Sequence, residues 1–198
     1  MLNHSTKSAI KLNLSEQQRL DLISAVFTDN FFKTENTQLI GGADEPLYTP
    51  SLITGKPHQL FFRENFVSSA LHEIAHWCIA GKQRRLQQDF GYWYQPDGRT
   101  VDEQAQFESM EVKPQALEWI FSNACGQKFN PSADNLNACE DDKADDIHFK
   151  QALIKQARQW CKSQQLPPRA KIFIEALTKE FNTTDVYNLE YYQLSYLA

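Results

Sequence analysis

The segment from Asn65 to Ala80 constrains the fold most, because it predicts a helix that is apolar on most of its circumference. Its apolar residues are Phe66, Val67, Ala70, Leu71, Ile74, Ala75, Trp77 and Ile79. A helix of this kind is normally buried, so we expect the rest of the chain to surround it. Its polar residues share one narrow stripe, which consists of Asn65, Ser69, His72 and His76. Buried polar groups need partners, so this stripe marks a candidate site.

The remaining segments predict an α+β fold that is mostly helical, with a small antiparallel sheet. Further helices are expected over residues 15–32, 102–124, 146–165 and 169–182, the second of them interrupted at Pro114. Between residues 37 and 63, short apolar runs are broken by glycine and proline, which is typical of strands and turns. The acidic segment 130–146 predicts a solvent-exposed loop. No repeat or linker divides the 198 residues, so we expect a single domain over 1–198.

The composition is that of an ordinary water-soluble chain. Hydrophobic residues make up 41% and charged residues 23% of the sequence, which argues against a disordered or membrane-embedded protein. The formal net charge of -5 argues against a general nucleic-acid binder, which needs an excess of lysine and arginine. The four cysteines form no CxxC pair, and no apolar secretory signal is visible. We therefore expect reduced thiols and a cytoplasmic protein.

His72, Glu73 and His76 form an HExxH segment within the apolar helix. On a helix, residues four apart lie on one face, so the two imidazoles are close enough to share a metal ion. The alternative is that both histidines are core residues hydrogen-bonded to the backbone. We favour a metal site, because the polar stripe on a buried helix needs partners that a metal or a polar cleft would supply.

A third ligand is expected from the helix over 102–124, which offers Glu108 and Glu111. On a helical projection Glu111 lies nearer the buried face, so we take Glu111 as the ligand and Glu108 as the alternative or as a neighbour of the site. Glu103 and Glu118 are expected to be solvated. The histidines outside the motif, His4, His58 and His148, are not expected to be ligands, and His148 is expected at the surface.

Two histidines and a carboxylate suit two enzymatic chemistries. One is zinc hydrolysis, a metallopeptidase in which Glu73 acts as the general base. The other is oxygenation by non-haem iron, which needs open positions for dioxygen and substrate. A third reading is a non-catalytic binding module with a structural metal. The HExxH form by itself favours the metallopeptidase.

Four segments carry a resemblance to a known family. They are DEPLY, ALHEIAHWCIAGKQRR, DFGYWYQPDGR and FESMEVKPQALEWIF. Together they resemble the bacterial elongation factor P hydroxylase family, most clearly over residues 37 to 125.

The resemblance implies a non-haem iron hydroxylase that uses Fe(II) and dioxygen. Its implied substrate is the lysine of elongation factor P that already carries a β-lysyl group. His72, His76 and Glu111 match the family's metal-binding pattern, and Glu73 then either orients a ligand or has no catalytic role. Whether 2-oxoglutarate is a cosubstrate stays open, as does the oligomeric state. No nucleic acid or membrane is implied as a partner.

The cations Lys82, Arg84 and Arg85 follow the HExxH helix directly. They are commonly no more than a solvated cluster at a helix end. Because the implied protein substrate is acidic, we expect these three cations to help dock it.

Overall fold

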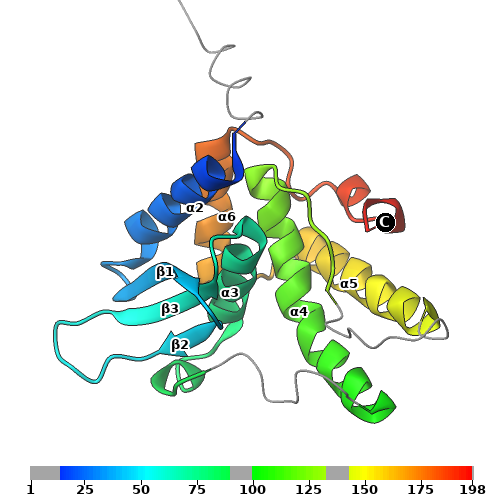
Figure 1. The fold of residues 1–198 in the computed structure, drawn as a ribbon. Helices are drawn as coiled ribbons and strands as arrows, with labels where there is room; N and C mark the ends of the chain where they lie inside the picture. The colour runs from blue at the N-terminus through cyan, green and yellow to red at the C-terminus, as the bar shows by residue number, and fades with distance from the viewer. Residues whose placement is uncertain (1–13, 90–99, 133–142, 198) are drawn as a thin grey trace, which may run out of the picture.

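Five α-helices and a three-stranded sheet make up the described part of the chain, in agreement with the predicted α+β class (Figure 1). The structure, a computed structural model, describes residues 14–89, 100–132 and 143–197. The α-helices are α2 (Glu16–Phe31), α3 (Val67–Ile79), α4 (Val101–Cys125), α5 (Lys143–Ser163) and α6 (Pro168–Phe181). The strands are β1 (Thr37–Ala43), β2 (Leu47–Thr49) and β3 (His58–Arg63), and short 3-10 helices lie at Arg84–Leu86, Leu189–Tyr191 and Leu194–Tyr196.

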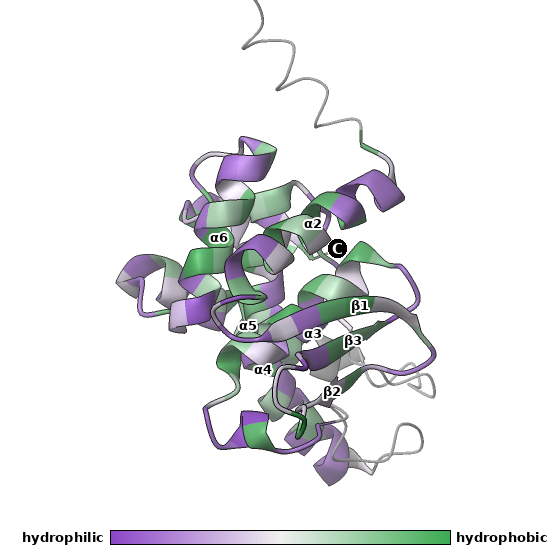
Figure 2. Cartoon of the chain, turned by 90° about the vertical axis from the view of Figure 1, so that its left-hand side faces the viewer, coloured by the Kyte–Doolittle hydropathy of each residue, from purple (hydrophilic) through white to green (hydrophobic). Residues whose placement is uncertain are grey.

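Helix α3 lies at the centre of the molecule, as its apolar sequence predicts. It packs against β3 on one side and against α4 on the other, and it also contacts α2 and α6 (Figure 1). Five of its residues, Val67, Ala70, Leu71, Ile74 and Ala75, have no exposed surface. They belong to the contiguous hydrophobic core that also contains residues of α2, α4, α5 and α6. The outer helices carry hydrophilic as well as hydrophobic residues (Figure 2), which is the pattern of helices with one buried face.

The sheet is mixed, which corrects the expectation of a purely antiparallel one. Strand β3 lies between the other two and pairs antiparallel with β2 but parallel with β1. The short connection after β1 reverses the chain into β2, and the loop after β2 reverses it again. Strand β3 therefore returns in the direction of β1 and separates it from β2.

Helix α4 runs without a break through Pro114, which corrects the predicted interruption. It begins with a capping box, in which Thr100 accepts from the backbone of Glu103 and the Glu103 carboxylate accepts from the backbone of Thr100. It ends at Gly126, whose φ of 70° suits glycine. Proline removes one backbone hydrogen bond, but α4 is packed against α3, α5 and α6, and this packing holds the helix together.

Helix α5 begins at Lys143, so the last residues of the predicted 130–146 loop are helical. Residues 133–142 lie outside the described part of the chain. Pro168 opens α6, where a missing backbone N–H costs nothing, and the left-handed Asn182 closes it. Helices α4 and α6 pack against α3, and α5 packs against α4.

Candidate metal centre

His72 and His76 lie one turn apart on the same face of α3, as the HExxH spacing predicts. Their Nε2 atoms are 3.1 Å apart. Both side chains are partly buried, with 28% of the His72 side chain and 18% of the His76 side chain exposed. The other faces of α3 pack into the core, so this is the face on which the helix opens toward solvent.

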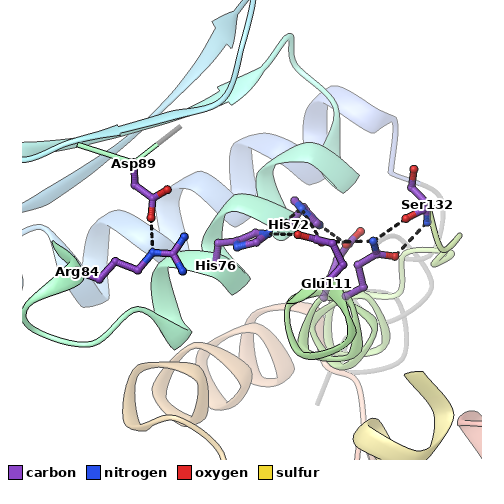
Figure 3. Close-up of polar contacts among 8 residues, drawn as sticks. His72, His76, Arg84, Asp89, Glu111 and Ser132 are labelled. Atoms are coloured by element: carbon purple, nitrogen blue, oxygen red, sulfur yellow. Dashed lines mark hydrogen bonds and ion pairs between the residues drawn. The ribbon is translucent and has the colours of Figure 1, made fainter. Parts of the chain in front are cut away.

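Helix α4 places Glu111 against both imidazoles (Figure 3). Its Oε1 is 3.2 Å from Nε2 of His76, and its Oε2 is 3.5 Å from Nε2 of His72. Only 3% of Glu111 is exposed. The structure therefore brings together the two histidines and the carboxylate that the sequence singles out.

The spacing of these three side chains suits a single metal ion. Ligand atoms that are each about 2.1 Å from one ion, at bond angles of about 90–110°, lie about 3.0–3.4 Å apart. The separations of 3.1 and 3.2 Å lie within this range, and the 3.5 Å separation, which involves the other carboxylate oxygen, is slightly longer. Among the described residues, this is the one group of three histidine, cysteine or acidic side chains that is close enough to hold an ion.

Glu118 contacts the other side of the His72 ring, which corrects the expectation that Glu118 is solvated. Its Oε2 accepts a hydrogen bond from Nδ1 of His72 at 2.9 Å, and only 6% of the residue is exposed. Burial lowers the pKa of His72, but the hydrogen bond to Glu118 and the charge of Glu111 outweigh it and raise this pKa to about 10. Because Nδ1–H is donated to Glu118, Nε2 is the atom left to face Glu111.

Glu111 is ionised although it is buried. Burial raises the pKa of this carboxyl, but His76, His72 and the amide of Gln115 lower it to about 2. Nε2 of Gln115 lies 3.4 Å from Oε2 of Glu111. A carboxylate that is charged and fixed by its neighbours has the form that a metal ligand requires.

Glu73 also lies at the site, but its carboxylate is not engaged. It is 8% exposed, and burial raises its pKa above the usual range, opposed by the charges of His72 and His76. In the part of the chain that the structure describes, no donor is hydrogen-bonded to this carboxylate. Glu73 is therefore free to interact with a group that enters the site.

These side chains open onto a cleft of about 300 Å³ between α3, α4 and the segment that follows α4. This volume is at the lower end of the range for ligand sites. The other lining residues are Arg63, Ser68, Ser69, Phe107, Gln115, Asn130 and Ser132. The cleft is therefore acidic at its base and polar along its walls.

The alternative carboxylates lie outside this group. Glu108 accepts a hydrogen bond from Nε2 of Gln104 at 2.9 Å, and it is not part of the metal-sized cluster. Glu103 is exposed, as predicted, and caps α4.

The remaining histidines do not join the cluster either. Nδ1 of His58 accepts from the backbone N–H of Ser51 at 2.9 Å. His148 is exposed on α5, as predicted, while His4 lies outside the described residues. The three described cysteines, Cys78, Cys125 and Cys161, are free thiols, as predicted.

The cations after α3 differ in their surroundings, and Arg85 is not the solvated residue that the sequence predicts. Its Nη1 is 2.7 Å from Oε2 of Glu35, and only 15% of its side chain is exposed. Arg84 pairs with Asp89, and Lys82 is exposed. The aromatic run 90–94 lies outside the described residues.

Sequence reasoning missed two buried side chains of α4, Gln115 and Glu118. With Glu111 they stand at positions i, i+4 and i+7, which share one helical face. That spacing was the signal that could have found them. A third missed residue is Arg169 of α6, which donates hydrogen bonds to backbone carbonyls at the C-terminal end of α3. Nothing in the sequence around Arg169 indicates this contact.

Fold and site together define an α+β protein in which two histidines and a glutamate are arranged to hold one metal ion. Residues 26–192 match the family model described as Elongation factor P hydroxylase. A relative from Haemophilus influenzae, named Elongation factor P lysine hydroxylase, is 45% identical over 173 residues, which cover 87% of this chain and 95% of the relative. The chain belongs to the elongation factor P hydroxylase family, as its motifs predict. No helix in the described residues has the length and hydropathy that a membrane span requires.

Proposed function

We propose that this protein hydroxylates the β-lysylated lysine of elongation factor P at an iron ion held by His72, His76 and Glu111. The observation that carries the proposal is the triad itself, two imidazoles and one carboxylate at metal-binding distances, in a chain of this family. The name of the Haemophilus influenzae relative supports the same reaction and substrate. A translation factor as substrate agrees with the predicted cytoplasmic location.

The donor set fits Fe(II), since two histidines and one carboxylate leave coordination positions open. Bound Fe(II) would supply the redox chemistry that puts one oxygen atom from dioxygen into a C–H bond. A structural zinc site normally has four protein ligands, whereas the described residues offer three. This difference favours an enzyme over a binding module with a structural metal.

The residues around the triad have separate tasks in this proposal. Glu118 keeps the proton of His72 on Nδ1, so that Nε2 is the free donor. The charged Glu111 and the neighbouring Glu73 and Glu118 make the base of the cleft acidic. This acidic lining favours a cationic substrate such as a lysine side chain. Glu73, which has no hydrogen-bond partner among the described residues, is the carboxylate available to it.

The test is oxygen incorporation. The purified chain is loaded with Fe(II) in the absence of oxygen and then incubated with β-lysylated elongation factor P, a reductant and air. Mass spectrometry is expected to show a gain of one oxygen atom on the modified lysine, and no gain when air is withheld. Cleavage of peptide bonds by the zinc-loaded protein, without oxygen incorporation by the iron-loaded one, would instead establish the metallopeptidase.

Glu73→Gln distinguishes the two chemistries on the same residue. A zinc hydrolase needs a base beside the metal-bound water, so its turnover should nearly vanish. In the proposed hydroxylase Glu73 contacts the cationic substrate and is not a base for a metal-bound water, so a partial loss of about 10–100-fold is expected. The turnover rates of the wild type and of Glu73→Gln are compared at matched metal content, so that loss of metal is not mistaken for loss of catalysis.

A further inference from the structure

Gln115 makes an unusual set of contacts for a side chain in the middle of a helix. It is 2% exposed. Its Nε2 donates to the backbone carbonyl of Ser132 at 2.7 Å, and its Oε1 accepts from the backbone N–H of Ser132 at 3.0 Å. The same Nε2 lies 3.4 Å from Oε2 of Glu111. One amide therefore contacts both a candidate metal ligand and a distant stretch of backbone.

That stretch, residues 126–132, runs back along α4 toward the site, and we refer to it as the strap (Figure 1). The left-handed Gly126 turns the chain at the end of α4. Phe129 then stacks on Trp119, with ring centroids 5.5 Å apart and planes 17° from parallel. One turn earlier in α4, Gln115 fixes Ser132. Two anchors thus hold the strap, and its residues Asn130 and Ser132 form a wall of the cleft.

The Gln115 amide uses its donors and its acceptor almost completely. A primary amide has two N–H groups and one oxygen, and here they serve the strap and the Glu111 carboxylate together. The other oxygen of Glu111 faces His76. Ser132 lies on the opposite side of Glu111, as Figure 3 shows. The Gln115 amide therefore joins the end of the strap to the Glu111 oxygen that faces His72.

We infer that Gln115 is a positioning residue that fixes the Glu111 carboxylate and the cleft wall relative to each other. The inference rests on the proposed function, because it takes Glu111 as a ligand of the iron. Side chains that hydrogen-bond metal ligands typically change metal affinity or activity by about 10–100-fold when they are removed. A residue that only fills the core would instead change the stability of the fold and nothing at the site.

The test uses the full chain with Gln115→Met, which removes the amide at nearly the same volume. The Kd for Fe(II) is measured without oxygen by competition with a chelator of known affinity. The KM for elongation factor P and the melting temperature are measured beside it. We expect the Kd for Fe(II) to rise about 10–100-fold and the KM to rise as well.

A second variant, Gln115→Asn, keeps a buried amide and lowers the risk of misfolding. Because it is one methylene shorter, it places the amide beyond hydrogen-bonding distance of Ser132 and is expected to weaken Fe(II) binding too. Phe129→Leu loosens the strap at its other anchor and should raise the KM while leaving the Kd for Fe(II) unchanged. Gln104→Met is the matched control, a glutamine of the same helix bound to Glu108, and should change neither value.

The outcomes separate this inference from the proposed function. If wild-type protein binds Fe(II) and hydroxylates its substrate, and both Gln115 variants bind Fe(II) equally well, the role of Gln115 is wrong and the function stands. If Phe129→Leu weakens Fe(II) binding as much as Gln115→Met does, general loosening explains the result, and the inference is also overturned. If wild-type protein binds no Fe(II), the proposed function fails first. Should Gln115→Met not fold, the Gln115→Asn measurement decides alone.

Discussion

Two buried polar clusters lie along α3, and they differ in how completely they are paired. The first is the metal-site cluster, formed by His72, His76, Glu111 and Glu118 together with Glu73. The second is the arginine cluster at the C-terminal end of the helix, formed by Glu35, Arg85 and Arg169 around Trp77. Both bring several charged side chains into the core, where an unpaired charge is costly.

Most of the polar partners of the arginine cluster come from the protein itself. Nη2 of Arg169 donates to the carbonyls of Trp77, Cys78 and Ala80 at 2.7, 3.2 and 2.7 Å, so it caps α3 where the helix dipole favours a cation. Its guanidinium also lies 4.5 Å from the centre of the Trp77 ring. The Nε1 of Trp77 and the Nε atoms of both arginines have no acceptor among the described residues, and an adjoining cavity of about 20 Å³ has room for about one water molecule.

The metal-site cluster is different, because it opens onto a cleft. Its three carboxylates outnumber its two histidines, and the carboxylate of Glu73 has no partner in the described chain. Polar groups that pair within the fold help to hold it together, whereas a carboxyl that faces a cleft without a hydrogen-bond partner can bind a cation from outside. These contacts indicate a stabilising role for the arginine cluster and a binding role for the face of α3 that carries the two histidines.

The largest expected effect is that of Glu111→Ala, which should weaken metal binding and leave the arginine cluster unchanged. Two donors remain, so Fe(II) affinity should fall by more than about 100-fold, beyond the loss typical of residues around the ligands. Hydroxylation should become undetectable. Glu108→Ala is the matched control on the same helix and should keep both metal and activity. Metal content after desalting is the measurement, and the reverse result would make Glu108 the ligand.

Arg169→Met, in the arginine cluster, should instead destabilise the fold. Three buried carbonyls lose their donor, and Glu35 loses a neighbouring cation. The free energy of unfolding should fall by about 3 kcal/mol, and the melting temperature by roughly 6–12 °C. The exposed neighbour Lys171→Met should change it by less than about 0.5 kcal/mol.

The folded Arg169→Met protein should still bind Fe(II) with wild-type affinity at temperatures well below its melting point. Weakened binding under those conditions would show that the two clusters are coupled through α3, and the division between stability and binding would be lost.

The features that sequence predicts well here are those set by spacing within one element. The i and i+4 positions of His72 and His76 place both rings on one face of α3, whatever packs around it. The choice of Glu111 over Glu108 follows from the buried face of α4 in the same way.

The features that sequence reasoning misses depend on which helices and strands pack against each other. Glu118 was expected to be solvated, because nothing within α4 shows that His72 of another helix offers it a hydrogen bond. Arg85 was expected to be exposed, because its partner Glu35 lies fifty residues earlier in the chain. The parallel pairing of β1 with β3 likewise depends on a strand that inserts between two others. In each case tertiary contacts decide.

The smallest effect expected is that of Glu118→Ala, which should change how the metal-site cluster responds to pH. In the metal-free protein the pKa of His72 is raised from 6.5 to about 10. The protonated ring therefore stabilises the metal-free fold fully below about pH 6.5, and this stabilisation is lost as the pH rises toward 10. A metal ligand must be neutral, so Fe(II) binding expels that proton. Apparent affinity should then rise with pH by up to about tenfold per unit.

Removing the Glu118 carboxylate removes the main group that holds this proton, so the pKa of His72 falls and the pH dependence of Fe(II) affinity becomes flatter. Turnover at saturating metal should also drop by about 10–100-fold, because the ring is no longer oriented. Glu118→Gln keeps an acceptor for Nδ1–H and should recover part of the turnover, but not the steep pH dependence. Fe(II) affinities at pH 6.5, 7.5 and 8.5 provide the measurement. Equal slopes in wild type and both variants would show that Glu118 does not set the charge of His72.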